Sequence, residues 1–230
     1  MEIRLKGVPL AVIMRTPGDD AMLATGFALT EGIVLRPDEL AAVEALGDQD
    51  DARWDLVLAD GVDVDPERFR RNFFSTSSCG ICGKASIDAV RVAAAFPAAV
   101  TVTTETLLTL SARMRERQET FEATGALHAA ALFRENGELM TIAEDVGRHN
   151  AVDKVVGRAS RDAWPVTGIL MVSGRISFEI VQKAAVAGIG ALAAVSAPST
   201  LAIDLGREFG MTVIGFLRGA DFNVYTGSVS

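Results

Sequence analysis

The chain has 230 residues, 49% of them apolar and 23% charged, which is enough apolar material for one large or two small hydrophobic cores and excludes global disorder. Asp and Glu number 30 against 22 Lys and Arg, giving a net charge of -8. Such a surface repels polyanions, so we expect no nucleic-acid binding. A local cluster of Arg or Lys can still hold one small phosphorylated ligand.

Cysteine usage and hydropathy point to a reducing cytoplasm. The chain contains two cysteines, Cys79 and Cys82, which is not a disulfide scaffold. Residues 1–30 lack a basic start followed by an apolar run, so we expect no secretory signal. The uncharged stretch 184–203 is rich in Ala and Gly and contains Pro198, which favours the end of a buried helix and a buried strand over a membrane span.

The first 74 residues predict a small N-terminal α/β unit. Two β-type runs around Lys6-Gly7 fit a hairpin, and a helix follows them. The expected elements are strands at Glu2–Leu5 and Leu10–Met14, a helix over Asp19–Thr30, a short helix starting at Pro37 and a strand at Trp54–Leu58.

Residues 75–98 form the second predicted segment, a flexible loop with a connecting helix. Small and hydroxyl residues surround both thiols over Ser75–Lys84. Apolar residues between Ile87 and Phe96 then predict a helix that Pro97 ends, because proline cannot continue a helix.

Residues 99–230 alternate strands and helices regularly. The expected order is a helix over Thr104–Thr120, strands at Ala126–Arg134 and Leu139–Ile142 joined by an Asn136-Gly137 turn, a helix at Asn150–Gly157, a strand at Gly168–Ser173, a helix at Ser177–Ala187, a strand at Ala191–Ser196, a helix at Thr200–Phe209 and a strand at Met211–Leu217. Continuous apolar strands separated by amphipathic helices predict a layered α/β domain whose mixed, partly parallel sheet has helices on both faces.

The Cys79-Gly80-Ile81-Cys82 motif offers several chemistries. Two thiols at this spacing can form a disulfide, share a metal ion, or let one attack while the other resolves a persulfide or mixed disulfide. His128 and His149 do not form a second close ligand pair, so we expect no structural metal. Gly80 and the hydroxyl residues before Cys79 indicate an exposed reactive loop, while reversible dithiol exchange stays open as an alternative.

A charged block at 144–154 is the second candidate feature. Six ionisable side chains crowd a strand-to-helix turn, at the sheet edge where open α/β folds bind ligands. Arg148 and the helix N-terminus suit an anion, and His149 and Asp153 are further candidates for binding. The alternative is a helix cap with surface ion pairs.

Two more groups complete the candidate site. His128 lies at a predicted strand start, where a lone histidine is more often a packed polar residue. The Ser173-Gly174-Arg175 turn and Ser177 follow a buried strand and can line the same sheet edge as the charged block. The C-terminal segment can stack aromatic rings on a heterocycle or pin the terminus to the core. Its candidate binding residues are Phe216, Arg218, Phe222, Asn223, Val224, Tyr225 and Thr226.

In this order, the features resemble the formate dehydrogenase accessory sulfurtransferase family, FdhD. The matching segments are Met14–Gly18, Gly26-Phe27 with Thr30–Ile33, Ser78–Gly83, Thr124-Gly125 with His128–Ala130, Glu144–Lys154, Ser173–Arg175 and Phe222–Thr226. The charged block is highly specific, whereas a bare CxxC is not. One departure is Ala126, which stands where a second glycine is common in the family.

The resemblance implies a cytoplasmic, homodimeric sulfurtransferase. It takes persulfide sulfur from a cysteine desulfurase and passes it to the molybdenum bis(guanine dinucleotide) cofactor, which formate dehydrogenase needs, and it binds guanine nucleotides as mimics of that cofactor. By position, Cys79 matches the persulfide-bearing residue, with Cys82 as its partner, and Phe222–Thr226 match the segment that contacts the cofactor. The fold it implies for the C-terminal domain is cytidine-deaminase-like.

Two other classes of function remain open. A chaperone that only binds the cofactor would need the C-terminal segment but neither thiol. A dithiol oxidoreductase would need both thiols and no guanine nucleotide.

Overall fold

The computed structural model of the protein describes residues 1–47, 52–69 and 97–230. Cys79, Cys82 and the helix expected before Pro97 lie outside the described residues. The expected domain boundary at residue 74 lies there too, so it stays a prediction.

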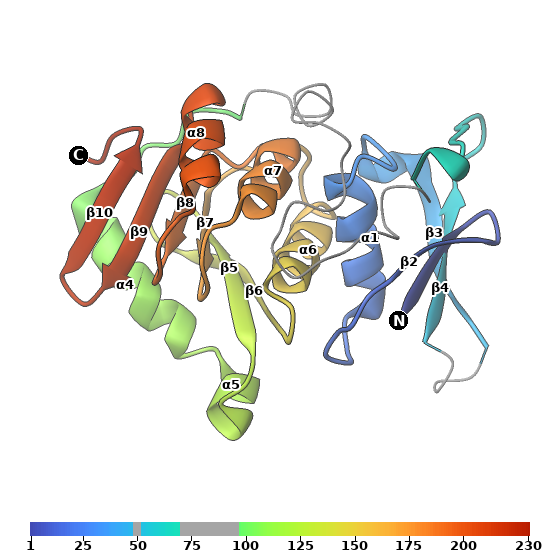
Figure 1. Ribbon diagram of the computed structural model, residues 1–230, viewed down its shortest axis with the longest axis horizontal. Helices are drawn as coiled ribbons and strands as arrows, with labels where there is room; N and C mark the ends of the chain where they lie inside the picture. The colour runs from blue at the N-terminus through green and yellow to red at the C-terminus, as the bar shows by residue number, and fades with distance from the viewer. Residues whose placement is uncertain (48–51, 70–96) are drawn as a thin grey trace.

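The N-terminal unit is a four-stranded sheet packed on one helix (Figure 1). Its elements are β1 Glu2–Leu5, β2 Val8–Val12, α1 Asp20–Thr30, the 3-10 helix η1 Pro37–Glu39, β3 Leu40–Leu46 and β4 Arg53–Leu58. The sheet order is β2-β1-β4-β3, with β1 and β4 parallel. Lys6 and Gly7 both have positive φ, as a two-residue hairpin turn requires, so the predicted hairpin is confirmed.

In the N-terminal unit the structure adds one strand, β3, that the sequence did not indicate, and in the larger unit it adds β10 (Asp221–Thr226). The helix predicted from Pro37 is only η1, and β3 follows it directly. The Ala-rich segment 40–46 has weak strand propensity, but it pairs antiparallel with β4 while Leu40 and Val43 pack against the N-terminal core. Tertiary pairing therefore decides its conformation.

The larger, six-stranded sheet has the order β10-β9-β8-β7-β5-β6. Strands β7, β8 and β9 are parallel, and their connections run through α7 and α8, whereas β5, β6 and β10 pair antiparallel with their neighbours. The elements are α4 Thr104–Arg115, α5 Glu119–Thr124, β5 His128–Phe133, β6 Leu139–Asp145, α6 Arg148–Ala159, β7 Ile169–Val172, α7 Phe178–Ala187, β8 Ala191–Ala194, α8 Thr200–Glu208, β9 Thr212–Arg218 and β10 Asp221–Thr226.

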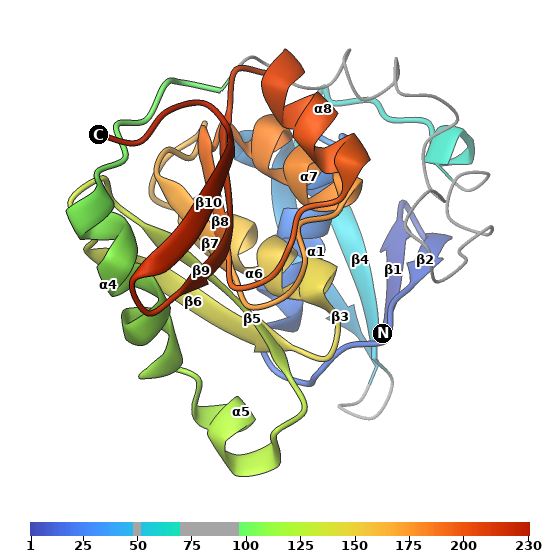
Figure 2. The ribbon, with the colours of Figure 1, turned by 60° about the vertical axis from the view of Figure 1, so that its left-hand side comes forward.

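Helices cover both faces of this sheet, as Figure 2 shows, with α4 on one face and α6, α7 and α8 on the other. Along β7, Ile169 and Met171 belong to the core beneath α4, while Leu170 and Val172 belong to the core beneath the other three helices. Because both faces of the sheet are buried, the sequences of its central strands are apolar without interruption. The predicted layered α/β fold is confirmed; its likeness to cytidine deaminases stays a prediction.

The single helix predicted over 104–120 is wrong, because the structure breaks it into α4 and α5. The break is held by the Glu144 carboxylate of β6, whose two oxygens accept hydrogen bonds from the backbone amides of Thr120 (2.8 Å) and Phe121 (2.7 Å). A carboxylate at the first turn of α5 satisfies amides that have no partner within the helix. This contact comes from another element and is invisible in the local sequence.

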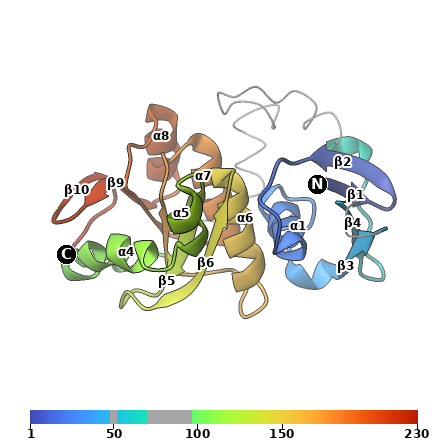
Figure 3. The same ribbon diagram turned by 90° about the horizontal axis from the view of Figure 1, so that it is seen from below.

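The two units meet through α1 and α6, which lie side by side between the sheets (Figures 1 and 3). A Cβ atom on Gly26 would stand 1.8 Å from the Asp153 carbonyl oxygen, and one on Gly157 would stand 2.0 Å from that of Met22. Glycine at both positions therefore permits the close approach of these helices. Among the helices of the described ranges, none is both long enough and apolar enough to cross a membrane.

Candidate functional site

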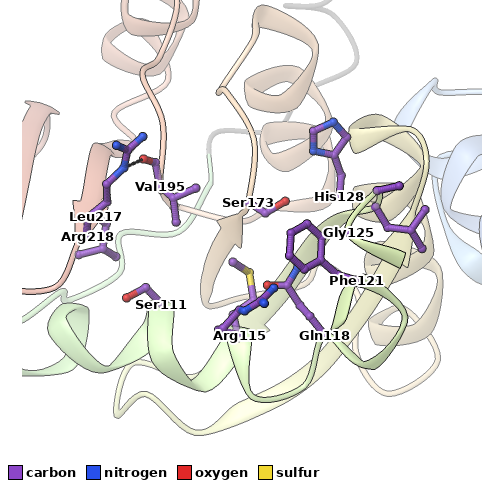
Figure 4. Close-up of a pocket in the computed structure, with 13 residues that line it drawn as sticks. Ser111, Arg115, Gln118, Phe121, Gly125, His128, Ser173, Val195, Leu217 and Arg218 are labelled. Carbon is purple, nitrogen blue, oxygen red and sulfur yellow. Dashed lines mark hydrogen bonds between the residues drawn. The ribbon is translucent and has the colours of Figure 1, made fainter. Parts of the chain in front are cut away.

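A pocket of about 550 Å³ opens beneath the carboxyl ends of the parallel strands, on the α4 face of the large sheet (Figure 4). Its lining comes from the ends of β7, β8 and β9, the start of β5, and the α4 and α5 helices. Parallel strands direct their following loops to this edge, which is the usual ligand position in open α/β sheets. The volume is typical of small-molecule sites.

Ser173 and His128 line the pocket together, and of the two the sequence placed Ser173 at this edge. The Ser173 hydroxyl oxygen accepts a hydrogen bond from the Ala129 amide (2.8 Å), which joins the end of β7 to β5. A Cβ atom on Gly174 would lie 3.3 Å from His128 Nδ1 and 3.7 Å from Arg148 Cδ, so the glycine lets both side chains approach the turn. Burial, helped by the nearby Arg148 charge, lowers the pKa of His128, which favours neutral imidazole.

Cationic groups surround this pocket. Arg218 ends β9 and donates from Nε to the Val195 carbonyl (2.7 Å). Arg115 pairs with Glu122 (2.8 Å) and stacks its guanidinium 4.4 Å from the centre of the Phe121 ring. Arg148 lies beside His128, and its Nε is buried without a hydrogen-bond partner among the described residues. The edge can therefore attract an anion.

The charged block does not act as one surface, since part of it forms a buried network. Asp145 and Lys154 form a buried ion pair of 2.7 Å. Asp145 also accepts from the Thr16 amide (3.1 Å) and from Asn150 Nδ2 (2.8 Å), and Lys154 donates to the Thr16 carbonyl (3.0 Å). These groups fasten the segment after β2 to the β6–α6 turn. The alternative of surface ion pairs is wrong for this pair, which is internal.

Asp153 is also buried away from the pocket, at the junction of α1, α6 and α7. Its carboxylate accepts from Thr30 Oγ1 (2.8 Å) and Lys183 Nζ (2.9 Å), and Lys183 also contacts Glu31 (2.8 Å). Burial raises the pKa of Asp153 to about 6, against the opposing charge of Lys183. Burial disfavours the charged form of Lys183, yet the two carboxylates outweigh it and raise its pKa.

His149 lies between this cluster and the pocket edge. Its Nε2 is 3.1 Å from Ser177 Oγ and 3.8 Å from Glu179 Oε2. Burial, together with the positive charges of Lys183 and Arg148, lowers the pKa of His149 to about 3. The ring is therefore neutral at pH 7 and serves as a hydrogen-bonding group.

The C-terminal candidates occupy an edge hairpin, β9–β10, and of these Arg218 alone lines the pocket. Phe216, Asn223 and Val224 are exposed, and none of them lines the pocket. Phe222 packs against the core beneath α4, Thr226 donates to the Met211 carbonyl (2.7 Å), and Tyr225 lies against Gly215. The aromatic segment and the pocket are neighbours rather than one surface.

The polar groups that α4 and the turn after it bring to the pocket were not predicted from the sequence. Ser111 and Arg115 are four residues apart on α4, which places them on one side of that helix, whereas Gln118 lies between the end of α4 and the start of α5. That spacing was the available signal, next to the apolar positions Leu110 and Met114. Within the described ranges no group of three or more His, Cys, Asp or Glu is arranged to hold a metal ion.

Comparisons with known proteins agree on one family. The FdhD/NarQ family model matches residues 1–229. A sulfur carrier protein FdhD from Streptomyces coelicolor is 52% identical over 240 residues, covering 99% of this chain and 85% of that protein. The protein of the same name from Mycobacterium tuberculosis is 45% identical over 240 residues, covering 98% of this chain and 87% of that one.

A solved structure supports the fold. The crystal structure of a protein described as a candidate formate dehydrogenase accessory protein, from Desulfotalea psychrophila, superposes with a TM-score of 0.77 at 22% identity, covering 98% of this chain and 85% of that one. The family match spans both sheets, the charged block and the C-terminal hairpin. This chain belongs to the FdhD/NarQ family.

Proposed function

We propose that this protein is a sulfur carrier in the maturation of formate dehydrogenase. The observation that carries the proposal is the family match over residues 1–229, with relatives named sulfur carrier protein FdhD at 45% and 52% identity. The two cysteines of the chain, Cys79 and Cys82, supply the chemistry that such a carrier requires.

The proposed reaction is a persulfide relay, a sulfurtransferase activity. The Cys79 thiolate attacks the outer sulfur of a cysteine desulfurase persulfide, that S–S bond breaks, and the desulfurase cysteine leaves as a thiolate. Cys82 then attacks the Cys79 sulfur, which releases hydrosulfide and leaves a Cys79–Cys82 disulfide for an external dithiol to reduce. The sulfur acceptor is the molybdenum bis(guanine dinucleotide) cofactor, which the protein handles as a substrate.

The pocket fits part of this acceptor. Its volume suits one nucleotide arm, the apolar side chains of Met114 and Phe121 suit a base, and Arg218 suits a phosphate. A second copy of the chain in a homodimer would provide a pocket for the second arm. From the pocket, the ligand would extend along β9 toward the β10 residues Phe222–Thr226.

Intact mass measurement tests the proposal directly. After incubation with a cysteine desulfurase and cysteine, the wild-type chain should gain the mass of one sulfur atom on Cys79, and Cys79→Ala should gain none. Nucleotide binding without any sulfur adduct would favour the cofactor chaperone. A disulfide that cycles without an adduct or nucleotide binding would favour the dithiol oxidoreductase.

A further inference from the structure

Gln118 is the unusual polar group of the pocket. It lines the cavity and is only 5% exposed, and no side-chain hydrogen bond joins it to any residue in the described part of the chain. Its amide atoms are not among the polar atoms of the described ranges that are shut off from solvent without a partner, so they reach the space of the cavity. An amide left open at a cavity wall is a group prepared for a ligand.

Its surroundings specify the kind of ligand. Met114 and Phe121 also line the pocket, and Figure 4 shows Arg218 on the opposite side from Gln118 and Phe121. Arg115 also lines the pocket, but its charge is paired with Glu122 and stacked on Phe121. A neutral, half-apolar region with one free amide suits a heterocyclic base, while the Arg218 side suits its phosphates.

We infer that Gln118 is the residue that reads the nucleobase in this pocket. The inference rests on the proposed function, which supplies guanine as the base. The carboxamide oxygen accepts from guanine N1–H and the amide NH₂ donates to O6, which satisfies both halves of the side chain. The 2-amino group of guanine is left unread by Gln118.

This pairing makes a chemical prediction that a structural role would not. Hypoxanthine shares N1–H and O6 with guanine and lacks only the 2-amino group, so wild-type protein should bind GDP and IDP with similar Kd. In Gln118→Glu the carboxylate has no donor for O6 and pairs instead with N1–H and the 2-amino group. That variant should prefer GDP over IDP on the order of tenfold, because IDP lacks the 2-amino group and leaves one carboxylate oxygen without a donor.

The experiment measures Kd for GDP and IDP by calorimetry on the full-length chain. Gln118→Leu should weaken both nucleotides together, again on the order of tenfold, since an apolar side chain reads neither atom. Gln182 is another buried glutamine, on α7 and outside the pocket lining, so Gln182→Leu and Gln182→Glu are matched controls that should leave both Kd values unchanged. Melting temperatures verify that each variant folds.

The outcomes separate this inference from the proposed function. Suppose that the wild type binds GDP and that both Gln118 variants keep its Kd values and its GDP/IDP ratio. That result would overturn the base-reading role of Gln118 alone. A wild type that binds neither nucleotide would overturn both the role and the guanine cofactor as ligand. A shift of the GDP/IDP ratio in Gln118→Glu, absent from Gln182→Glu, is the result we expect.

Discussion

At the scale of single residues, Lys183 stabilises the junction of three helices. Its ammonium group lies within 3.0 Å of oxygen atoms of Thr30, Glu31 and Asp153, and it is buried with Thr30 and Asp153. Removing one partner of a buried pair leaves an uncompensated charge. The cluster is therefore a place where one substitution affects both units of the molecule.

We expect Lys183→Met to lower the free energy of unfolding by about 3–5 kcal/mol, as breaking a buried ion pair does. Lys6→Met is the control, because Lys6 pairs with the exposed Asp63 at 2.7 Å and such a pair contributes about 1 kcal/mol or less. Urea denaturation of both variants measures the difference. Equal losses would contradict an ionic role for Lys183.

His149 gives the protein a pH dependence of stability. Its pKa is about 3 in the folded state and about 6.5 when unfolded. The unfolded chain therefore binds more protons between these values, so stability contributed by neutral His149 is present above pH 6.5 and is lost as pH falls toward 3. At pH 5 the loss is about 2 kcal/mol.

We expect His149→Gln to reduce the fall in unfolding free energy between pH 7 and pH 5 by about 2 kcal/mol. Glutamine stays neutral and can still hydrogen-bond the Ser177 hydroxyl, which isolates the titration from the contact. Denaturation curves at the two pH values provide the measurement. If the variant loses as much unfolding free energy between pH 7 and pH 5 as the wild type does, His149 is not held neutral by burial and its cationic neighbours.

At the scale of elements, the crossing of α1 and α6 depends on two glycines. In an exposed helix interior, Gly→Ala is stabilising by about 1 kcal/mol. In Gly157→Ala the new methyl group would meet the Met22 carbonyl, so the sign reverses and we expect a loss of about 3 kcal/mol. Thermal unfolding measures it, and a rise in melting temperature would mean that the helices do not approach this closely.

The elements that could be predicted are those whose own residues decide their conformation. The apolar runs of β7, β8 and β9 and the helices between them are encoded locally, because each strand is buried on both faces. The strand β3 and the break between α4 and α5 depend on β4 and Glu144, which no local window contains. The same limit applies to the site: Ser173 follows from a strand end, whereas Gln118 enters the pocket because of that break.

At the scale of the whole molecule, the two faces of the large sheet have different roles. The N-terminal unit packs beyond α6 on one face, where Asp145, Lys154 and Thr16 hold it. The pocket opens on the opposite face, beneath α4. The most specific sequence motif of the chain thus serves largely to assemble the two units, while its Glu144, Arg148 and His149 contact the pocket side.

This division predicts that sulfur loading and ligand binding can be separated by mutation. In the proposed function, Cys79 carries the sulfur, and Arg218 at the pocket holds a phosphate of the acceptor. Cys79→Ala should therefore lose the persulfide adduct and keep its Kd for GDP. Arg218→Ala, at an exposed position, should still load sulfur while its affinity for GDP falls on the order of tenfold, because a charge-assisted contact is lost.

Both variants should fail to mature formate dehydrogenase in cells that lack the wild-type protein, for different reasons that mass measurement and calorimetry distinguish. Cys82→Ala should be measured with these two variants. Loss of the Cys82 thiol should slow sulfur release without preventing sulfur loading, because an external thiol can replace it. Met14→Ala serves as a control, since its exposed side chain lies away from the pocket lining. Full formate dehydrogenase activity with Cys79→Ala would refute the carrier role. Loss of sulfur loading with Arg218→Ala, or of GDP binding with Cys79→Ala, would mean that the thiol and the pocket form one inseparable site.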